Sequence, residues 1–303
     1  MTNVELVGLV ESTWASARPE RRLAALKALR VAIEPGLIEL FDALVDAKLA
    51  NVEDDPNAIV LILVHGIQTD GAWHRLVQNE LSDVQNINVI ESSYDCVTAA
   101  QLVGPFRKGP IEDVTREMRE ARRREPRARM MVIAHSFGSY IISRILKDAS
   151  DLEFERIVLC GSIIPRKFKW DLFARNMAQS SILNHVGTED FYPVLATFAS
   201  VGYGASGRLG FKTGLVVDRF FKLGHSGFFT PEHIRAHWRP FITNGHIEKS
   251  QWDTDKPTTG MGILMASHPW IGRPLAIAAV VALASLLRWL WILAHHTWHS
   301  FSL

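Results

Sequence analysis

The chain has 303 residues, of which 48% are hydrophobic and 21% are charged. This composition excludes a disordered chain and fits one large folded domain with an apolar segment attached. Lysine and arginine (33) balance aspartate and glutamate (32), so no overall positive charge indicates a nucleic-acid partner. Cys96 and Cys160 form no zinc or disulfide pattern, and no secretory leader is evident at Met1. We therefore expect a folded domain in the reducing cytoplasm.

The first 50 residues have apolar side chains three and four positions apart, a spacing typical of amphipathic helices. Pro19 and the segment 34–36 interrupt this pattern, because proline and glycine break helical hydrogen bonding. We predict two or three helices that pack against the main domain; a homo-oligomer or partner contact through these helices is the alternative. The apolar positions include Leu23, Leu26, Leu29, Leu37, Leu40, Phe41 and Leu44.

After a polar segment at 51–57, short apolar runs alternate with segments of helical periodicity. This alternation predicts an α/β fold with a mostly parallel sheet covered by helices, and the continuous runs are typical of strands buried on both faces. The predicted strands are Ile59–Val64, Ile87–Tyr94, Met130–Ala134, Ile157–Cys160, Ile182–Val186 and Leu215–Phe221. The predicted helices are Ala72–Leu81, Ile111–Arg124, Tyr140–Leu146 and Pro231–Phe241.

Residues 116–129 contain seven arginines with three glutamates between them. Such a pattern is typical of a solvated helix face with ion pairs along it. A surface that contacts anionic lipid headgroups is the alternative.

Ser136 lies where a predicted strand meets a predicted helix, in the sequence Ala134-His135-Ser136-Phe137-Gly138. Small residues two positions on either side of a serine are typical of a nucleophile elbow, because the tight turn brings strand and helix together. Ala134 stands in place of the usual first glycine. The helix N-terminus also supplies N–H groups that stabilise negative charge. We predict that Ser136 is a nucleophile; a serine that only caps the helix is the alternative.

A strand that ends in His65-Gly66-Ile67, about 70 residues before the serine, is typical of an oxyanion-hole loop. The chemistry requires two backbone N–H donors that point at the developing oxyanion. We assign them to Ile67 and to Phe137, the residue after the nucleophile. His65 and Gly66 are predicted to support the loop, His65 as an orienting hydrogen-bonding residue.

These two motifs and their order resemble the α/β-hydrolase superfamily over roughly residues 59–241. The strings at 133–138, 160–165 and 184–190 are similar to a bacterial group of lipase- or esterase-like hydrolases whose function is poorly defined. The resemblance implies the fold and a serine mechanism. It implies no particular substrate.

In this fold the triad follows the order serine, acid, histidine, with the acid after a later strand and the histidine after the last one. Asp190 follows the predicted strand at 182–186, and His225 follows the one at 215–221. We assign Asp190 to orient His225, and His225 to accept the serine proton. The alternatives to Asp190 are Asp171, Glu189 and Asp218.

His233 and His237 lie four apart on a predicted helix, a spacing that could place both on one metal ion. No third ligand accompanies them, so we expect no metal and no other cofactor.

The apolar segment Pro274–Ala294 has 21 residues, about the length that crosses ~30 Å of hydrocarbon. Arg288 lies close enough to its end to reach the headgroups, and Trp270, Trp289, Trp291 and Trp298 lie at or beyond its ends, as in an aromatic belt. We predict a membrane-spanning tail anchor; a helix in the membrane interface or a buried helix is the alternative.

The predicted organisation is a helical segment at 1–50, a catalytic domain at 51–245, a linker at 246–269 and a membrane anchor at 270–303. The predicted function is a serine hydrolase that cleaves carboxylic esters, lipid esters in particular, through an acyl-enzyme at a membrane surface. Two alternatives remain open, namely a thioesterase for acylated protein and a membrane-anchored scaffold without turnover. Only about twenty residues separate the strands at 157–160 and 182–186, too few for a large lid domain.

Overall fold

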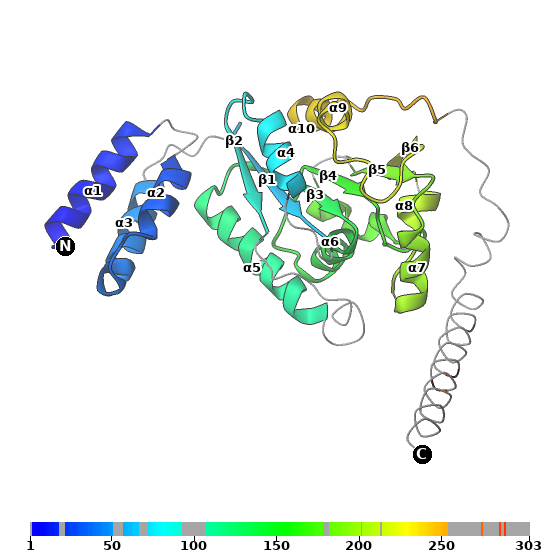
Figure 1. Cartoon of the computed structure of the whole chain (residues 1–303), viewed down its shortest axis with the longest axis horizontal. Coiled ribbons are helices and arrows are strands. Elements are labelled where there is room, and N and C mark those ends of the chain that lie inside the picture. Colours follow the sequence, from blue (N-terminus) through cyan, green and yellow to red (C-terminus); the bar gives the residue numbers. More distant parts are fainter. Residues whose placement is uncertain are drawn as a thin grey trace, which may run out of the picture.

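The fold is described from a computed structural model of the whole chain (Figure 1). The described residues are 2–17, 22–50, 57–66, 72–92, 107–177, 182–200, 202–212, 214–253, 274, 285 and 288.

Within the described residues, six parallel strands form one sheet in the order β2-β1-β3-β4-β5-β6 (Figure 1). Each strand lies at a predicted apolar run, so the predicted parallel α/β sheet is confirmed. Because all strands run the same way, their carboxyl ends meet at one edge, where ligands bind in open α/β sheets. The strands are β1 (Ile59–Val64), β2 (Ile87–Glu91), β3 (Arg129–His135), β4 (Arg156–Cys160), β5 (Ile182–Gly187) and β6 (Val216–Phe221).

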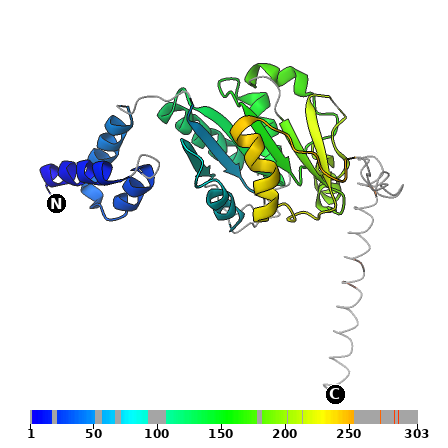
Figure 2. The same cartoon turned by 90° about the horizontal axis from the view of Figure 1, so that it is seen from above.

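Helices cover both faces of the sheet (Figure 2). One face packs against α5 (Lys108–Arg124) and α6 (Phe137–Asp148), and the other against α4 (Ala72–Glu80) and the helices that follow β6. The apolar residues of β1 alternate between these two cores, which explains why its run is continuous. Val60, Ile62 and Val64 join the first core, and Ile59, Leu61 and Leu63 join the second.

The connections after β4 and β5 contain short helices that the sequence pattern did not predict. The 3-10 helix η5 (Trp170–Asn176) lies in the β4–β5 connection. Two helices, α7 (Tyr192–Ala199) and α8 (Ser206–Leu209), lie between β5 and β6. The helix α7 begins five residues after the end of β5 and so lies near the carboxyl edge of the sheet.

The helix predicted at 231–241 begins as expected but is not regular. Thr230 Oγ1 accepts the N–H of His233 at 3.2 Å at the start of α9 (Pro231–His233). The chain continues as the π-helix η6 (Ile234–Trp238), whose last turn is closed by the cap N–H of residue 239 donating to the Ile234 carbonyl, and then as α10 (Arg239–Asn244). Pro240 has no N–H and cannot continue the four-residue hydrogen-bond pattern.

The predicted N-terminal helices are present as α1 (Asn3–Ser16), α2 (Arg22–Arg30) and α3 (Ile38–Ala50). Thr2 and Glu5 form a capping box that begins α1. The apolar stripes pack mainly against one another in a small core of their own, and α3 contacts α5. The core residues are Leu6, Val10, Leu26, Ile33 and Phe41.

Residues 246–253, the described part of the predicted linker, lie along the outer edge of β6. The side chain of Asp253 accepts the Phe220 N–H at 2.9 Å, and Ser250 Oγ donates to the Phe220 carbonyl. The segment thereby satisfies backbone groups of an edge strand that would otherwise be open to pairing.

Among the described residues, no helix has both the length and the apolar content needed to cross a bilayer. The predicted span Pro274–Ala294 lies outside the described residues except at Pro274, Ser285 and Arg288, which are helical and exposed.

Candidate active site

Ser136 occupies the turn between β3 and α6 in a strained backbone conformation. Its φ is 54° and its ψ is −119°, and Asn86 is the other non-glycine residue with positive φ in the described part of the chain. A positive φ in a residue with a side chain costs energy and is typical of functional sites. The turn also leaves the serine partly exposed at the carboxyl edge of the sheet.

The small residues around Ser136 allow strand and helix to pack closely. A side-chain carbon on Gly138 would lie 2.3 Å from the Val64 carbonyl oxygen and 2.6 Å from that of His65. Ala134 is fully buried in β3. At Gly138 the motif therefore requires a residue without a side chain. At residue 134 the methyl group of alanine is accommodated in the core.

His225 and Asp190, the residues predicted as base and acid, are hydrogen-bonded to each other; they are called the acid–base pair below. The distance from His225 Nδ1 to Asp190 Oδ2 is 2.8 Å, and the Asp190 side chain is fully buried. A carboxylate accepts, so Nδ1 carries the proton and Nε2 is left with its lone pair. Two of the three alternative acids have other partners: Asp218 accepts from Asn184 at 2.7 Å, and Glu189 lies 4.0 Å from the Lys222 ammonium.

Gly161 lies between Ser136 and His225. The N–H of Ser136 donates to the carbonyl of the preceding residue, Cys160, at 3.1 Å. A side-chain carbon on Gly161, whose φ is +56°, would lie 2.8 Å from His225 Cε1. Ser136 and His225 therefore lie on the same edge of the sheet, around one glycine. Among the described residues no hydrogen bond joins Ser136 Oγ to His225 Nε2, and such bonds often form only when substrate is bound.

The predicted oxyanion hole is described in part. Phe137 is the first residue of α6, so its N–H has no acceptor within the helix. Gly66 lies against the nucleophile, because an added side-chain carbon would be 2.7 Å from Ser136 Cβ. His65 is buried, and its Nδ1 is 2.7 Å from the Gly66 carbonyl, which fits the predicted support of this loop. Ile67 lies outside the described residues.

Burial lowers the basicity of the histidines that surround the pair. Burial, followed by the nearby charge of His225, holds the pKa of His135 well below its ordinary value. Burial lowers the pKa of His74 to about 4, with a smaller contribution from His65. These imidazoles are neutral at neutral pH. His225 has 14% of its side chain exposed to solvent.

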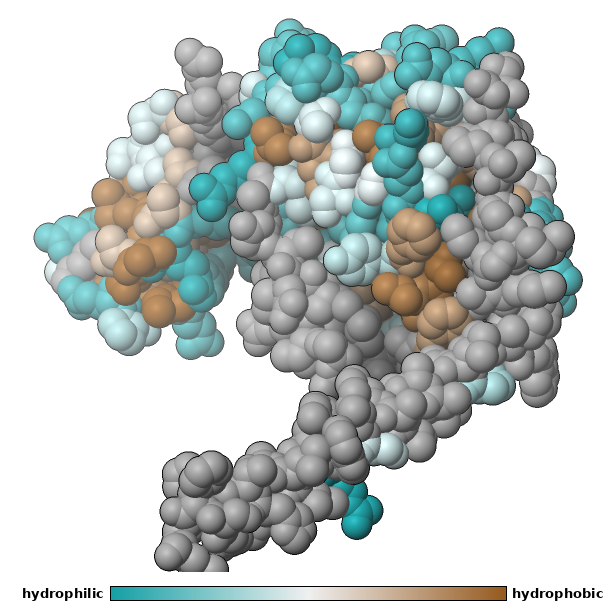
Figure 3. All heavy atoms as spheres, turned by 45° about the vertical axis from the view of Figure 1, so that its right-hand side comes forward, coloured by the Kyte–Doolittle hydropathy of each residue, from teal (hydrophilic) through white to brown (hydrophobic). Residues whose placement is uncertain are grey.

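The helix α7, absent from the predicted elements, places apolar side chains beside the base. The Tyr192 ring stacks on the His225 ring with their centroids 4.6 Å apart, and the Tyr192 N–H donates to Asp190 Oδ1 at 3.0 Å. Tyr192 is 63% exposed, Phe191 55% and Leu195 56%. Figure 3, which brings the α7 and α8 side forward, shows apolar surface gathered there. We call these three residues the α7 patch.

Arg208 of α8 lies behind this patch. Its guanidinium carbon is 4.3 Å from the centre of the Phe191 ring, and the nearby carboxylates of Asp190 and Glu189 favour its charged form, although burial, the larger effect, lowers its pKa. Arg208 thus places a positive charge near the acid of the pair. In the sequence, a proline near the start of 192–199 is the one feature that could have indicated the helix α7. That Tyr192 contacts His225 and that Arg208 contacts Phe191 depends on tertiary packing, which the sequence pattern does not reveal.

His233, one of the two histidines four residues apart, is hydrogen-bonded within the core. His233 Nε2 is 2.8 Å from Nδ1 of His185, a buried residue of β5, and Trp238 Nε1 donates to the same Nδ1 at 3.0 Å. Within the described ranges, no group of three or more histidine, cysteine, aspartate or glutamate side chains is placed to hold a metal ion. The histidines are part of the core between β5 and η6.

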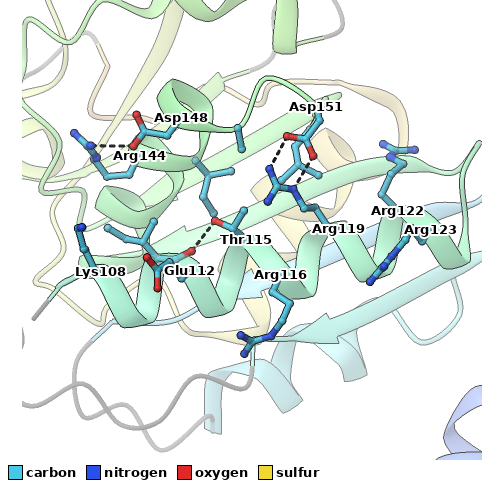
Figure 4. Close-up of a pocket in the computed structure, with 14 residues that line it drawn as sticks. Lys108, Glu112, Thr115, Arg116, Arg119, Arg122, Arg123, Arg144, Asp148 and Asp151 are labelled. Carbon is cyan, nitrogen blue, oxygen red and sulfur yellow. Dashed lines mark hydrogen bonds and ion pairs between the residues drawn. The ribbon is translucent and has the colours of Figure 1, made fainter. Parts of the chain in front are cut away.

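The arginine-rich stretch lies away from the site, along α5, where it borders a groove of about 680 Å³ between α5 and α6 (Figure 4). Arg119 binds Asp151 with two hydrogen bonds of 2.7 and 2.8 Å, and Arg122 donates to backbone carbonyls. The stretch is therefore an ion-paired, solvated helix face, as expected. Lipid contact at this face stays an untested alternative.

No protein-family model matches the chain, and no curated protein matches it. Solved structures with similar folds include a cutinase-like protein from Cryptococcus sp., with 11% identity over 64% of this chain and 97% of the other, and a TM-score of 0.40. An α/β serine hydrolase without a lid from Xanthomonas campestris has 16% identity over 69% and 87%, with a TM-score of 0.38. An acetyl xylan esterase has 13% identity over 59% and 94%, with a TM-score of 0.35.

The TM-scores are below 0.5 and the identities below 25%, so these likenesses assign no role to any residue of this chain.

Proposed function

We propose that the protein is a serine hydrolase that cleaves carboxylic esters, with Ser136 as nucleophile, His225 as general base and Asp190 as the residue that orients it. The observation that carries the proposal is the 2.8 Å hydrogen bond between His225 Nδ1 and buried Asp190, at the sheet edge that also presents strained Ser136. A serine hydroxyl is a weak nucleophile without a base. A histidine that a carboxylate holds in one tautomer can accept the serine proton and so activate the hydroxyl.

The reaction follows from these positions. Ser136 Oγ attacks the ester carbonyl carbon while its proton passes to His225 Nε2. The ester C–O bond then breaks, the leaving alcohol takes the proton from His225, and the acyl group remains on Ser136. Water then attacks the acyl carbon while one of its protons passes to His225 Nε2. The bond between the acyl carbon and Ser136 Oγ breaks, His225 returns the proton to Ser136 Oγ, and the acid leaves. In this proposal the Phe137 and Ile67 N–H groups bind the oxyanion in both steps.

We further propose lipid esters as the substrate class. The three large apolar side chains of the α7 patch are each more than half exposed, and one of them, Tyr192, stacks on the ring of His225. Apolar side chains at such exposure normally occur singly. In this proposal, the acyl chain that extends from the reacting carbonyl carbon contacts the α7 patch. The predicted tail anchor would hold the site beside a bilayer and supports the same class.

A fluorophosphonate probe tests the nucleophile. The wild-type chain should be labelled, and Ser136→Ala should not. Persistent labelling of Ser136→Ala would refute the assigned nucleophile, and an unlabelled wild type would favour the scaffold alternative. Release of fatty acid from phospholipid compared with acylated protein then separates the ester hydrolase from the thioesterase alternative.

A truncation tests the anchor. Removal of residues 270–303 should abolish binding to phospholipid vesicles and reduce hydrolysis of micellar p-nitrophenyl esters, while soluble short-chain esters are hydrolysed as before. Equal losses on both kinds of ester would mean that the tail supports folding instead.

A further inference from the structure

His135, the residue before the nucleophile, connects the elbow to the loop that carries the base. Its Nε2 is 3.1 Å from the backbone carbonyl oxygen of His225. A carbonyl oxygen only accepts, so His135 Nε2 must be protonated and donating. The acid–base pair therefore has a second attachment, which comes from β3 itself.

The imidazole of His135 is held firmly in that position. The residue is 1% exposed, and its ring lies 4.5 Å from the His225 ring and 4.8 Å, edge to face, from the Phe229 ring. A side-chain carbon on Gly161 would lie 3.2 Å from His135 Cδ2. The imidazole that carries the donor atom is thus enclosed by the His225 ring, the Phe229 ring and Gly161.

The tautomer of His135 is fixed as well. With the proton on Nε2, Nδ1 of the neutral ring is an acceptor, and this atom is buried without a hydrogen-bond partner among the described residues. Burial and the neighbouring His225 both oppose a second proton on the ring. A neutral His135 also avoids a like charge beside His225 when that base is protonated during the reaction.

We propose that His135 is a positioning residue, whose Nε2–H holds the His225 carbonyl and so fixes the distance of the base from Ser136. The side chain of His225 is oriented by Asp190 at the end of β5, and its backbone is located by His135 at the end of β3. The two hydrogen bonds have different effects. The bond from Asp190 selects the tautomer of the His225 ring, and the bond from His135 fixes the position of the His225 backbone. This inference rests on the proposed roles of Ser136 and His225.

Three replacements separate the donor from the bulk of the imidazole. His135→Gln can place an amide N–H near the position of Nε2, His135→Asn places its amide near Nδ1, and His135→Met fills the space with no donor. His246→Gln makes the same change at an exposed histidine, 60% exposed, and is the matched control. The measurements are the second-order rate of fluorophosphonate labelling, and kcat and KM on a soluble p-nitrophenyl ester, at a temperature where circular dichroism shows each variant folded.

His135→Gln should stay close to the wild type, whereas His135→Asn and His135→Met should lose roughly 10- to 100-fold in labelling rate and kcat with little change in KM. The proposal is overturned if His135→Gln falls as far as His135→Met, or if all three keep wild-type rates. Should His135→Met not fold, the comparison of glutamine with asparagine decides alone. Labelling that survives Ser136→Ala is a separate result, which refutes the proposed function and not the hydrogen bond.

Discussion

Gly138 lies so close to Val64 that a side-chain carbon on the glycine would be 2.3 Å from the carbonyl oxygen of the strand residue. That carbonyl belongs to the backbone of β1 and cannot rotate away. The contact fixes the distance between the first turn of α6 and the neighbouring strand, and with it the place of the serine two residues earlier.

We predict that Gly138→Ala lowers the free energy of unfolding by about 3 kcal/mol, because α6 must move away from β1. The same change at Gly109 in α5, where nothing lies within 4 Å, should leave stability unchanged or raise it by about 0.5 kcal/mol. Urea unfolding of both variants measures the difference. A Gly138→Ala variant as stable as Gly109→Ala would contradict the close approach.

Asp190→Asn keeps the shape of the acid but removes the charge that selects the Nδ1–H tautomer of His225. We expect kcat to fall by about 10³- to 10⁴-fold with little change in KM or in melting temperature. Steady-state kinetics on a soluble ester measure the effect. Asp151→Asn, which weakens an exposed ion pair with Arg119, is the control and should leave kcat as it is. A similar loss in both variants would show that Asp190 has no special place in the reaction.

The buried histidines should make the fold sensitive to acid. Burial lowers the pKa of His233 to about 3 in the folded state, below the ordinary value of about 6.5 in the unfolded chain. Between pH 6.5 and pH 3 the unfolded chain therefore binds more protons than the folded chain. The contribution of His233 to the free energy of unfolding is fully present above pH 6.5 and decreases as the pH falls toward 3. His233 alone should cost roughly 2 kcal/mol between pH 7.5 and pH 5.

The variant His233→Gln tests this contribution, because glutamine can still donate to His185 without titrating. Its free energy of unfolding should decline less steeply between pH 7.5 and pH 5 than that of the wild type, as measured with urea. His246→Gln, at an exposed position, should decline as the wild type does. Parallel curves for all three proteins would show that His233 binds its proton equally well in both states.

The α7 patch should matter for apolar substrates only. The double variant Phe191→Ser, Leu195→Ser removes two exposed apolar side chains, and we expect about a tenfold loss on micellar long-chain p-nitrophenyl esters, the size of one lost apolar contact. Hydrolysis of p-nitrophenyl acetate should continue at the wild-type rate. Val31→Ser, at a position 90% exposed among the N-terminal helices, is the control. A loss that is equal for both esters would place the patch in the fold and not in substrate binding.

The strands and the tight turn at Ser136 could be predicted from the sequence because local patterns determine them. Continuous apolar runs indicate strands covered on both faces, and the elbow requires small residues at fixed positions around Ser136. The α7 patch was not predicted, since a proline at 193 followed by glycines at 202, 204 and 207 is typical of a loop. The stacking of Tyr192 on His225 and the hydrogen bond from His135 depend on where distant segments meet, which periodicity does not record.

The left-handed backbone of Ser136 has a consequence for the evolution of the molecule. Any residue with a side chain is strained at a φ of 54°, and glycine alone would relax there at no steric cost. Ser136→Gly should therefore melt at a higher temperature than Ser136→Ala, although neither can react. Selection for stability alone would therefore favour glycine at this position over serine.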